Sequence, residues 1–321
     1  MPSRPMKLEG IHHVTCITAD APQNVEFYAG VLGLRLVKKS VNQDDPTVYH
    51  LFYGDEQGSP GADLTFFEYP GTQRGEAGAG MVHRICWRVA SDQALEFWEQ
   101  RLRAHGVSAQ ASDGGLRFQD PEGLEHELAV FAGGDEPLSG SSPEIPREHA
   151  LAGFDGVRAY AAEPAASARL LRDALGFAAV GADDREWRAR GEQREGFYRY
   201  DDAPPGTLAR QGAGSVHHVA FASRMEDHES WRAAVAESGA RPTPVIDRYY
   251  FRSIYFREPS GVLFEIATIG PGFAVDEPAE HLGERLSLPP RYESLRSQLE
   301  ATLTPLPDPR AALASRSAPQ S

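Results

Sequence analysis

Two pairs of adjacent histidines stand in apolar segments about two hundred residues apart. The first pair is His12 and His13 in GIHHVTCI, and the second is His217 and His218 in SVHHVAFA. Imidazole is a common metal ligand and proton carrier in proteins. Glu265 in GVLFEIAT is a third candidate, because a carboxylate among apolar residues needs a cation or a metal as its partner. Two histidines and one carboxylate are the ligand set typical of non-haem Fe(II) oxygenases.

The residues alone leave two questions open. Neighbouring side chains of a strand point to opposite faces, so we expect only one histidine of each pair to enter a cavity, and the alternation does not say which one. Any single histidine could equally be a hydrogen-bonded core residue. Glu265 could instead form a structural ion pair with one of the arginines that precede it, which are Arg248, Arg252 and Arg257.

Two further side chains are expected near the same cavity. Tyr255 lies in DRYYFRSIYFREP, ten residues before Glu265 and across a Pro/Gly turn. We therefore expect Tyr255 beside Glu265 on the adjacent strand, where a phenol can stabilise an anionic substrate or bound oxygen. His50 in VYHLFYGD is expected to line the pocket or to serve the structure rather than to bind a metal.

The elements that must position these residues occur in four similar copies, each of which reads as strand, helix and three strands. The copies begin GIHHVTCIT, MVHRICWRV, GFDGVRAYA and SVHHVAFAS. Aligned on the first strand, the pairs that correspond to the double histidines in the second and third copies are His83-Arg84 and Asp155-Gly156. Glu127 matches Glu265, and Thr65 stands at that position in the first copy. Only the first and fourth copies together supply a ligand set, which predicts a single metal centre.

The repeats predict an α+β fold. We expect four βαβββ modules paired into two domains, with curved mixed β-sheets that form a metal-holding cavity and with helices outside. The first domain is expected at 8–132 and the second at 150–275, each with two modules. A stretch rich in Gly, Ser, Pro and acidic residues predicts a linker at 133–149. Residues 276–321 form a C-terminal tail, expected to be disordered from about Leu306.

Composition excludes several classes of partner and reaction. The 321 residues carry a net charge of −14 with no basic stripe, which argues against nucleic acid and against a membrane as partner. The N-terminus does not have the pattern of a signal peptide, so a cytoplasmic location is expected.

The motifs GxGxxG, GxSxG, HExxH and the P-loop are missing, so hydride transfer, serine hydrolysis and phosphoryl transfer have no support. The sequence leaves open whether the chain forms a homo-oligomer.

Six stretches together resemble one protein family. They are GIHHVT, FYAGVLGLRLVKKSVNQDD, YHLFYGDEQGSPG, SVHHVAF, DRYYFRSIYFREPSGVLFEIAT and PGFAVDEP. Over about residues 8 to 300 the chain resembles the vicinal oxygen chelate superfamily, which includes glyoxalases, bleomycin resistance proteins and extradiol dioxygenases. Within that superfamily it resembles the hydroquinone-type ring-cleaving dioxygenases.

The resemblance implies a non-haem Fe(II) centre, with Mn(II) as the metal in some relatives. It implies that the ligands are His13, His218 and Glu265. Residues beside the ligands or in the substrate pocket are implied to be His12, Thr15, His217, Arg248 and Tyr255. Of these, His12, His217 and Tyr255 are implied to be catalytic, because they would move protons during the reaction. The implied activity is an extradiol-type dioxygenase that inserts O₂ into a hydroquinone or a catechol-like aromatic, so a small aromatic compound and O₂ are the expected partners.

Two other functions remain as alternatives. A glyoxalase-type lyase or isomerase would bind Ni(II) or Zn(II) and would need a carboxylate base across the cavity, where this chain has Thr65. A non-enzymatic protein that binds an aromatic compound would not need three converging ligands.

Overall fold

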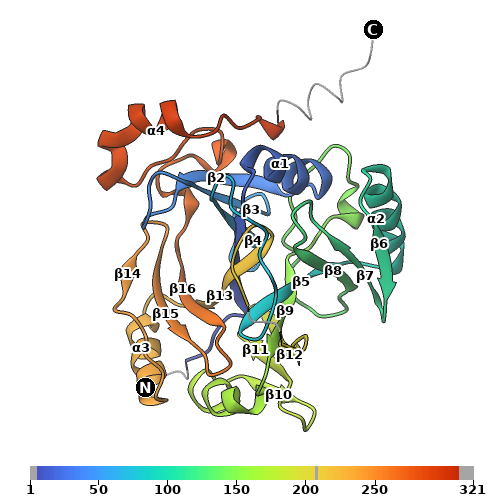
Figure 1. Cartoon of the computed structure of the whole chain (residues 1–321), viewed down its shortest axis with the longest axis vertical. Coiled ribbons are helices and arrows are strands. Elements are labelled where there is room, and N and C mark those ends of the chain that lie inside the picture. The colour runs from blue at the N-terminus through green and yellow to red at the C-terminus, as the bar shows by residue number, and fades with distance from the viewer. Residues whose placement is uncertain (1–5, 207–208, 311–321) are drawn as a thin grey trace.

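Two curved eight-stranded mixed sheets lie side by side in the computed structural model, which describes residues 6–206 and 209–310. Helix α2 (Asp92–Ala104) flanks one sheet and helix α3 (His228–Glu237) flanks the other, both on the outside of the molecule (Figure 1). The prediction of an α+β fold with curved mixed sheets and outer helices is therefore confirmed.

The first module shows how local sequence sets its elements, which are β1 (Ile11–Thr18), α1 (Ala21–Val25), β2 (Arg35–Val41), β3 (Tyr49–Gly54) and β4 (Asp63–Glu68). The carboxylate of Asp20 caps α1 by accepting a hydrogen bond of 3.0 Å from the backbone N–H of Gln23. The helix continues as a π-helical turn at Glu26–Val31. Gly33 follows it with a φ of +70°, a conformation that suits glycine at a helix end.

The other three modules repeat this order. The second contains β5 (Met81–Val89), α2, β6 (Ala109–Ser112), β7 (Gly115–Gln119) and β8 (Glu125–Val130). The third contains β9 (Phe154–Ala161), a π-helical turn at Leu170–Ala174, β10 (Ala178–Val180), β11 (Glu186–Arg190) and β12 (Glu195–Asp202). The fourth contains β13 (Ser215–Ser223), α3, β14 (Ile246–Asp247), β15 (Phe251–Arg257) and β16 (Leu263–Pro271).

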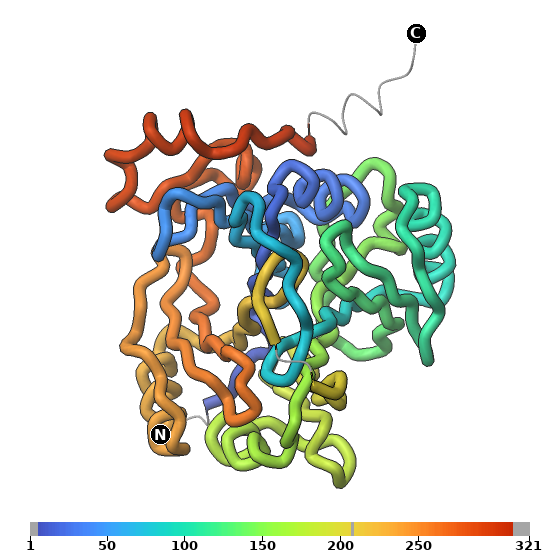
Figure 2. The backbone as a smooth tube through the Cα atoms, viewed as in Figure 1, coloured from blue at the N-terminus to red at the C-terminus, as the bar shows by residue number. Residues whose placement is uncertain are grey.

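Each sheet combines one module from each half of the sequence. The first sheet has the strand order β14-β15-β16-β13-β1-β4-β3-β2, and the second has the order β10-β11-β12-β9-β5-β8-β7-β6. The first and last modules therefore share a sheet, joined where β1 pairs antiparallel with β13. In Figure 2 the first module is blue to cyan and the last module runs from golden yellow, at β13, to orange. The sequence repeat divides the chain into halves at 8–132 and 150–275, but each sheet contains strands from both halves.

A continuous apolar core extends across both sheets, and the tryptophans Trp87, Trp98 and Trp187 are fully buried in it. A separate small apolar cluster lies on the first sheet and includes Phe52, Tyr250, Phe251, Ala220 and Phe273. Both clusters exclude water from the strands that carry the histidine pairs. Groups in such surroundings interact more strongly with one another than they would in water.

The C-terminal segment packs back onto the first sheet and contains helix α4 (Arg296–Thr302). Lys38 of β2 is fully buried and forms ion pairs with Asp276 and Glu277, which fix the start of this segment. Leu306 packs against the core, and Arg310 donates a 3.0 Å hydrogen bond to Glu56. This order up to Arg310 departs from the disorder expected from Leu306, and the rest of that expectation falls on residues outside those described. No helix among the described residues is long and apolar enough to cross a membrane.

Candidate metal centre

A β-bulge places both members of each histidine pair on the same side of the first sheet. Along β1 and β13, His13 pairs with Ala220 and Thr15 with His218, while His12 and His217 are the extra residues at two breaks in the register. The expectation that only one histidine of each pair faces the cavity agrees with the lining, which includes His13 and His218 but neither His12 nor His217. The reason differs from the regular alternation that the expectation assumed, because a bulge interrupts alternation at the residue that it adds.

Three side chains from three strands converge on one point. The Nε2 atoms of His13 on β1 and His218 on β13 are 3.2 Å apart. The Oε2 atom of Glu265 on β16 lies 3.1 Å from the first nitrogen and 2.9 Å from the second. All three residues are buried. Ligands at about 2.1 Å from one metal ion and at right angles to one another would be about 3.0 Å apart, which is the spacing of these atoms.

The charges of this cluster suit a cation. Burial lowers the pKa of His218, so its imidazole is neutral at pH 7. Burial alone would raise the pKa of Glu265, but His13 and His218 beside it hold that pKa well below its usual range. Neither oxygen of Glu265 accepts a well-formed hydrogen bond from the described residues. A buried carboxylate in this state fits a metal ion, because a carboxylate and imidazole nitrogens are the donor atoms that such an ion binds.

The alternative of a structural ion pair for Glu265 has no support in the geometry. Among the described residues, the ion-pair partners of Glu265 are His13 and His218. Arg248 instead pairs with Asp44, and Arg257 donates a hydrogen bond to the carbonyl oxygen of Gly261.

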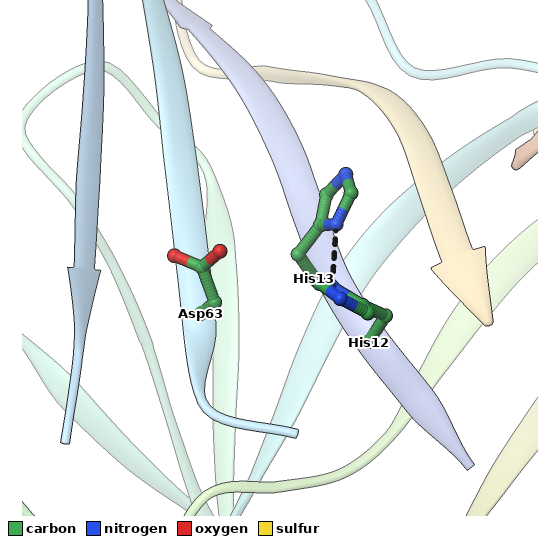
Figure 3. A group of neighbouring side chains, drawn as sticks. All are labelled: His12, His13 and Asp63. Atoms are coloured by element: carbon green, nitrogen blue, oxygen red, sulfur yellow. Dashed lines mark hydrogen bonds between the residues drawn. The ribbon is translucent and has the colours of Figure 1, made fainter. Parts of the chain in front are cut away.

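His12 determines which nitrogen of His13 carries the proton. The Nε2 atom of His12 lies 3.1 Å from the carbonyl oxygen of Thr268, which can only accept a hydrogen bond. Burial lowers the pKa of His12 to about 3, so His12 is neutral and its Nδ1 atom must be an acceptor. That atom is 2.9 Å from Nδ1 of His13, which therefore donates (Figure 3). Nε2 of His13, the atom that faces Glu265, is therefore the nitrogen available to a metal.

His217 supports His218 in a similar way. The Nδ1 atoms of the two rings are 2.8 Å apart. Burial lowers the pKa of His217 to about 3, so this ring is also neutral at pH 7. Each candidate ligand therefore has a neutral histidine behind it, on the side away from Glu265.

The remaining predicted residues line the same cavity. Tyr255 on β15 is the register partner of Glu265, as the hairpin spacing predicted, and its ring packs edge-on against His218 with centroids 5.6 Å apart. Thr15 accepts a 2.8 Å hydrogen bond from the hydroxyl of Thr65, and Nε2 of His50 lies 2.9 Å from that same hydroxyl. The lining is completed mainly by Asn42, Gln43, Asp44, Phe52, Phe67, Arg248, Tyr250 and Phe251.

Two acidic residues at the site have no signal in the sequence that points to them. Asp44 lies in the loop after β2 and binds Arg248. Asp63 begins β4 opposite His13 and, with His12 and His13, forms a second group of close potential ligand atoms (Figure 3). Burial raises the pKa of Asp63 well above its usual range, which disfavours the ionised form that binds a metal. Asp63 is thus a poorer ligand candidate than Glu265.

The second sheet has a protein cation where the first has its candidate metal centre. Arg84, at the position of His13, donates hydrogen bonds to Glu125 at 2.9 Å and to Glu127 at 3.1 Å. A Cβ atom added at Gly156, the position of His218, would lie 2.4 Å from the Phe197 ring. No ligand side chain fits there, and Arg84 neutralises the carboxylate that corresponds to Glu265.

Sequence comparison identifies the family. Residues 10–128 and 153–266 match the protein-family model described as "Glyoxalase/Bleomycin resistance protein/Dioxygenase superfamily". The chain belongs to this superfamily. Within it, the chain is 41% identical to the "Putative ring-cleaving dioxygenase MhqA" of Bacillus subtilis, over 94% of this chain and 100% of that protein. It is 34% identical to the "Chlorohydroquinone/hydroquinone 1,2-dioxygenase" of Sphingobium indicum, over 93% of this chain and 97% of that protein. These relatives confirm the prediction of an enzyme of the ring-cleaving dioxygenase class.

Solved structures of superfamily members agree with the fold. A crystal structure of a "putative dioxygenase" from Bacillus subtilis matches with a TM-score of 0.88 and 39% identity, over 94% of this chain and 99% of that one. Glyoxalase I from Zea mays matches with a TM-score of 0.57 and 15% identity, over 81% of this chain and 92% of that one. The second likeness concerns the fold alone.

Proposed function

We propose that the chain is a non-haem Fe(II)-dependent, extradiol-type ring-cleaving dioxygenase that inserts both atoms of O₂ into a hydroquinone or a catechol-like aromatic. The observation that carries the proposal is the buried cluster of His13, His218 and Glu265, with a carboxylate that only a cation would balance. A relative named a chlorohydroquinone/hydroquinone 1,2-dioxygenase supports the choice of ring. Mn(II) would fit the same ligand types, and a cytoplasmic location stays a prediction.

His13, His218 and Glu265 would hold the metal. When bound, Fe(II) would bring an aromatic oxygen and O₂ together and would supply the electron transfer that O₂ needs in order to react with a ring. Because His12 fixes the proton of His13 on Nδ1, the Nε2 lone pair is available without any rearrangement. The protein part of the site is in this respect already arranged for binding.

The side chains around the cluster would bind the ring and move its protons. Phe52, Phe67 and Phe251 present apolar surface to the cavity, which would hold an aromatic ring and exclude water. Tyr255 is opposite Glu265, and burial raises the pKa of its phenol, so Tyr255 is protonated and can donate to a developing oxyanion.

A neutral histidine next to the ligands can accept the proton that a hydroxyl group of the ring loses on binding. His217 suits this role because it is neutral, touches His218 and is less buried than His12. His50 is also neutral, since burial lowers its pKa well below the usual range, and it contacts the hydroxyl of Thr65.

Oxygen consumption tests the proposal against its alternatives. The protein is loaded anaerobically with Fe(II), mixed with methylhydroquinone or catechol, and then exposed to air in an oxygen electrode. Uptake of one O₂ per ring cleaved is expected. A glyoxalase-type lyase or a binding protein would consume no oxygen, so absence of uptake with every hydroquinone and catechol, despite bound iron, would refute the proposal.

A further inference from the structure

An ion pair joins the two modules of the first sheet at the edge of the metal cavity. Asp44 lies in the loop between β2 and β3, and Arg248 lies between β14 and β15. Nη1 of Arg248 donates to Oδ1 of Asp44 at 2.9 Å, and Nη2 donates to Oδ2 at 2.8 Å. This two-pronged arrangement is the strongest common form of an arginine–carboxylate pair.

Arg248 is the one arginine or lysine among the residues that line this cavity, and Asp44 is the one carboxylate. The guanidinium lies over the ring of Tyr255, 5.4 Å from its centroid, and Nε donates to the phenol oxygen at 3.4 Å. The side chain of Arg248 is 15% exposed, whereas that of Asp44 is 73% exposed. Asp44 therefore covers the guanidinium from the solvent side.

Backbone and side-chain contacts hold Asp44 in this place. The side chain of the preceding residue, Gln43, donates a hydrogen bond of 2.6 Å from Nε2 to the backbone carbonyl oxygen of Arg248. Its amide oxygen accepts a 2.7 Å hydrogen bond from Arg291 in the C-terminal segment. The hydrogen bond from Arg248 lowers the pKa of Asp44, so Asp44 is ionised at pH 7.

A guanidinium at the edge of a cavity is a ready receptor for a carboxylate on a ligand. Asp44 already accepts hydrogen bonds from both Nη atoms of Arg248. It also places a negative charge on the path by which a ligand would approach. A ring with its own carboxylate would have to displace Asp44 and would approach the negative charge of Glu265, which lies behind the lining beside His13 and His218. An uncharged ring meets neither obstacle.

We propose that Asp44 is a specificity-determining residue, which neutralises Arg248 and so makes the site select uncharged dihydroxylated rings over rings that carry a carboxylate. The proposal rests on the proposed function for its substrate class. It concerns the charge of the ring substituent, a property that the three candidate metal ligands leave open.

Methylhydroquinone and 2,5-dihydroxybenzoate are a matched pair of probes, because they share the hydroquinone ring and differ by a methyl group against a carboxylate. For each variant, kcat/KM for oxygen uptake is measured with both compounds. Binding of both compounds is also measured anaerobically by calorimetry on metal-loaded protein. We expect Asp44→Asn to raise the preference for 2,5-dihydroxybenzoate over methylhydroquinone by about tenfold, in kcat/KM and in affinity, since removing one partly screened charge has an effect of this size. The gain should shrink at high salt.

Three variants control this experiment. Asp44→Ser removes the same charge with a different side chain and should agree with Asp44→Asn. Asp44→Glu keeps the charge and should keep the wild-type ratio. Glu26→Gln changes the net charge equally on an exposed helical turn away from the cavity, and its ratio should not move.

The outcomes separate the two claims. A ratio that stays within twofold of wild type in both Asp44→Asn and Asp44→Ser, in proteins that turn over methylhydroquinone, would overturn the role of Asp44 and leave the dioxygenase intact. If no compound is turned over, the dioxygenase proposal fails, and the binding measurement still decides the charge preference.

Discussion

His12 and His217 occupy equivalent bulge positions on the two strands that join the first and last modules, β1 and β13. The second sheet has the same two β-bulges, because His83 and Asp155 are the extra residues where β5 pairs with β9. Two similar bulges in each sheet indicate that the bulge belongs to the module itself. In the first sheet it places a supporting histidine behind each candidate ligand.

Replacing His12 should weaken metal binding without removing a ligand. In His12→Ala, His13 loses the acceptor that fixes its proton on Nδ1, so both tautomers become populated and the ring is less well oriented. We expect metal affinity to fall about 10- to 100-fold, the usual effect of losing such a partner. Competition with a chelator measures the affinity, and circular dichroism verifies the fold. Unchanged affinity would show that the hydrogen bond from His13 to His12 does not prepare the site.

Removing the phenol of Tyr255 should slow turnover and leave the metal in place. Tyr255→Phe keeps the ring beside His218 but deletes the proton donor, so kcat for oxygen uptake should fall about 10²-fold at unchanged iron content. Tyr249→Phe deletes a hydroxyl in the same segment that does not line the cavity, and it should retain wild-type kcat. Equal activity of the two variants would remove Tyr255 from the mechanism.

Acid should destabilise the fold through buried histidines far from the metal centre. His126 on β8 is fully buried and contacts Tyr28 and Trp87. Burial lowers its pKa from 6.5 to about 3. Between these values the unfolded chain binds a proton that the folded chain does not, so the free energy of unfolding falls as the pH decreases. One such group contributes up to about 1.4 kcal/mol per pH unit.

Urea unfolding at several pH values between 7 and 4 measures this dependence. In His126→Gln, the slope of the unfolding free energy against pH should be smaller by about one proton. His281→Gln, at an exposed histidine, should keep the wild-type slope. If His126→Gln retains the full slope, the acid sensitivity arises elsewhere.

The sequence predicted the chemistry of the site better than its local geometry. The repeats singled out the two histidine pairs and Glu265, because only the first and fourth modules supply ligands, and the family resemblance implied His13 and His218 within the pairs. The Pro/Gly turn placed Tyr255 opposite Glu265, since register across a hairpin follows from counting residues. The bulges at His12 and His217 were not predicted, because a bulge depends on how two distant strands pair.

Contacts between distant segments were beyond prediction from one sequence. Asp44 and Arg248 are 204 residues apart, and although Arg248 was expected in the pocket, the sequence does not indicate that the two residues pair. Asp63 reads as an ordinary acidic residue at the start of a strand, and only the register of β1 with β4 places it opposite His13. Asp44 and Asp63 reach the site through sheet pairing, which the order of modules alone does not specify.

The number of metal ions per chain tests the central claim most directly. Purified wild-type protein and variants are loaded anaerobically with Fe(II), desalted and analysed for iron and protein. We expect about one iron per wild-type chain and almost none in Glu265→Gln or His218→Ala, each with a native circular dichroism spectrum. Glu127→Gln is the matched control, because Glu127 is the corresponding carboxylate of the second sheet and already pairs with Arg84. It should keep one iron. Full iron occupancy in Glu265→Gln and His218→Ala, or loss of iron in Glu127→Gln, would contradict the account.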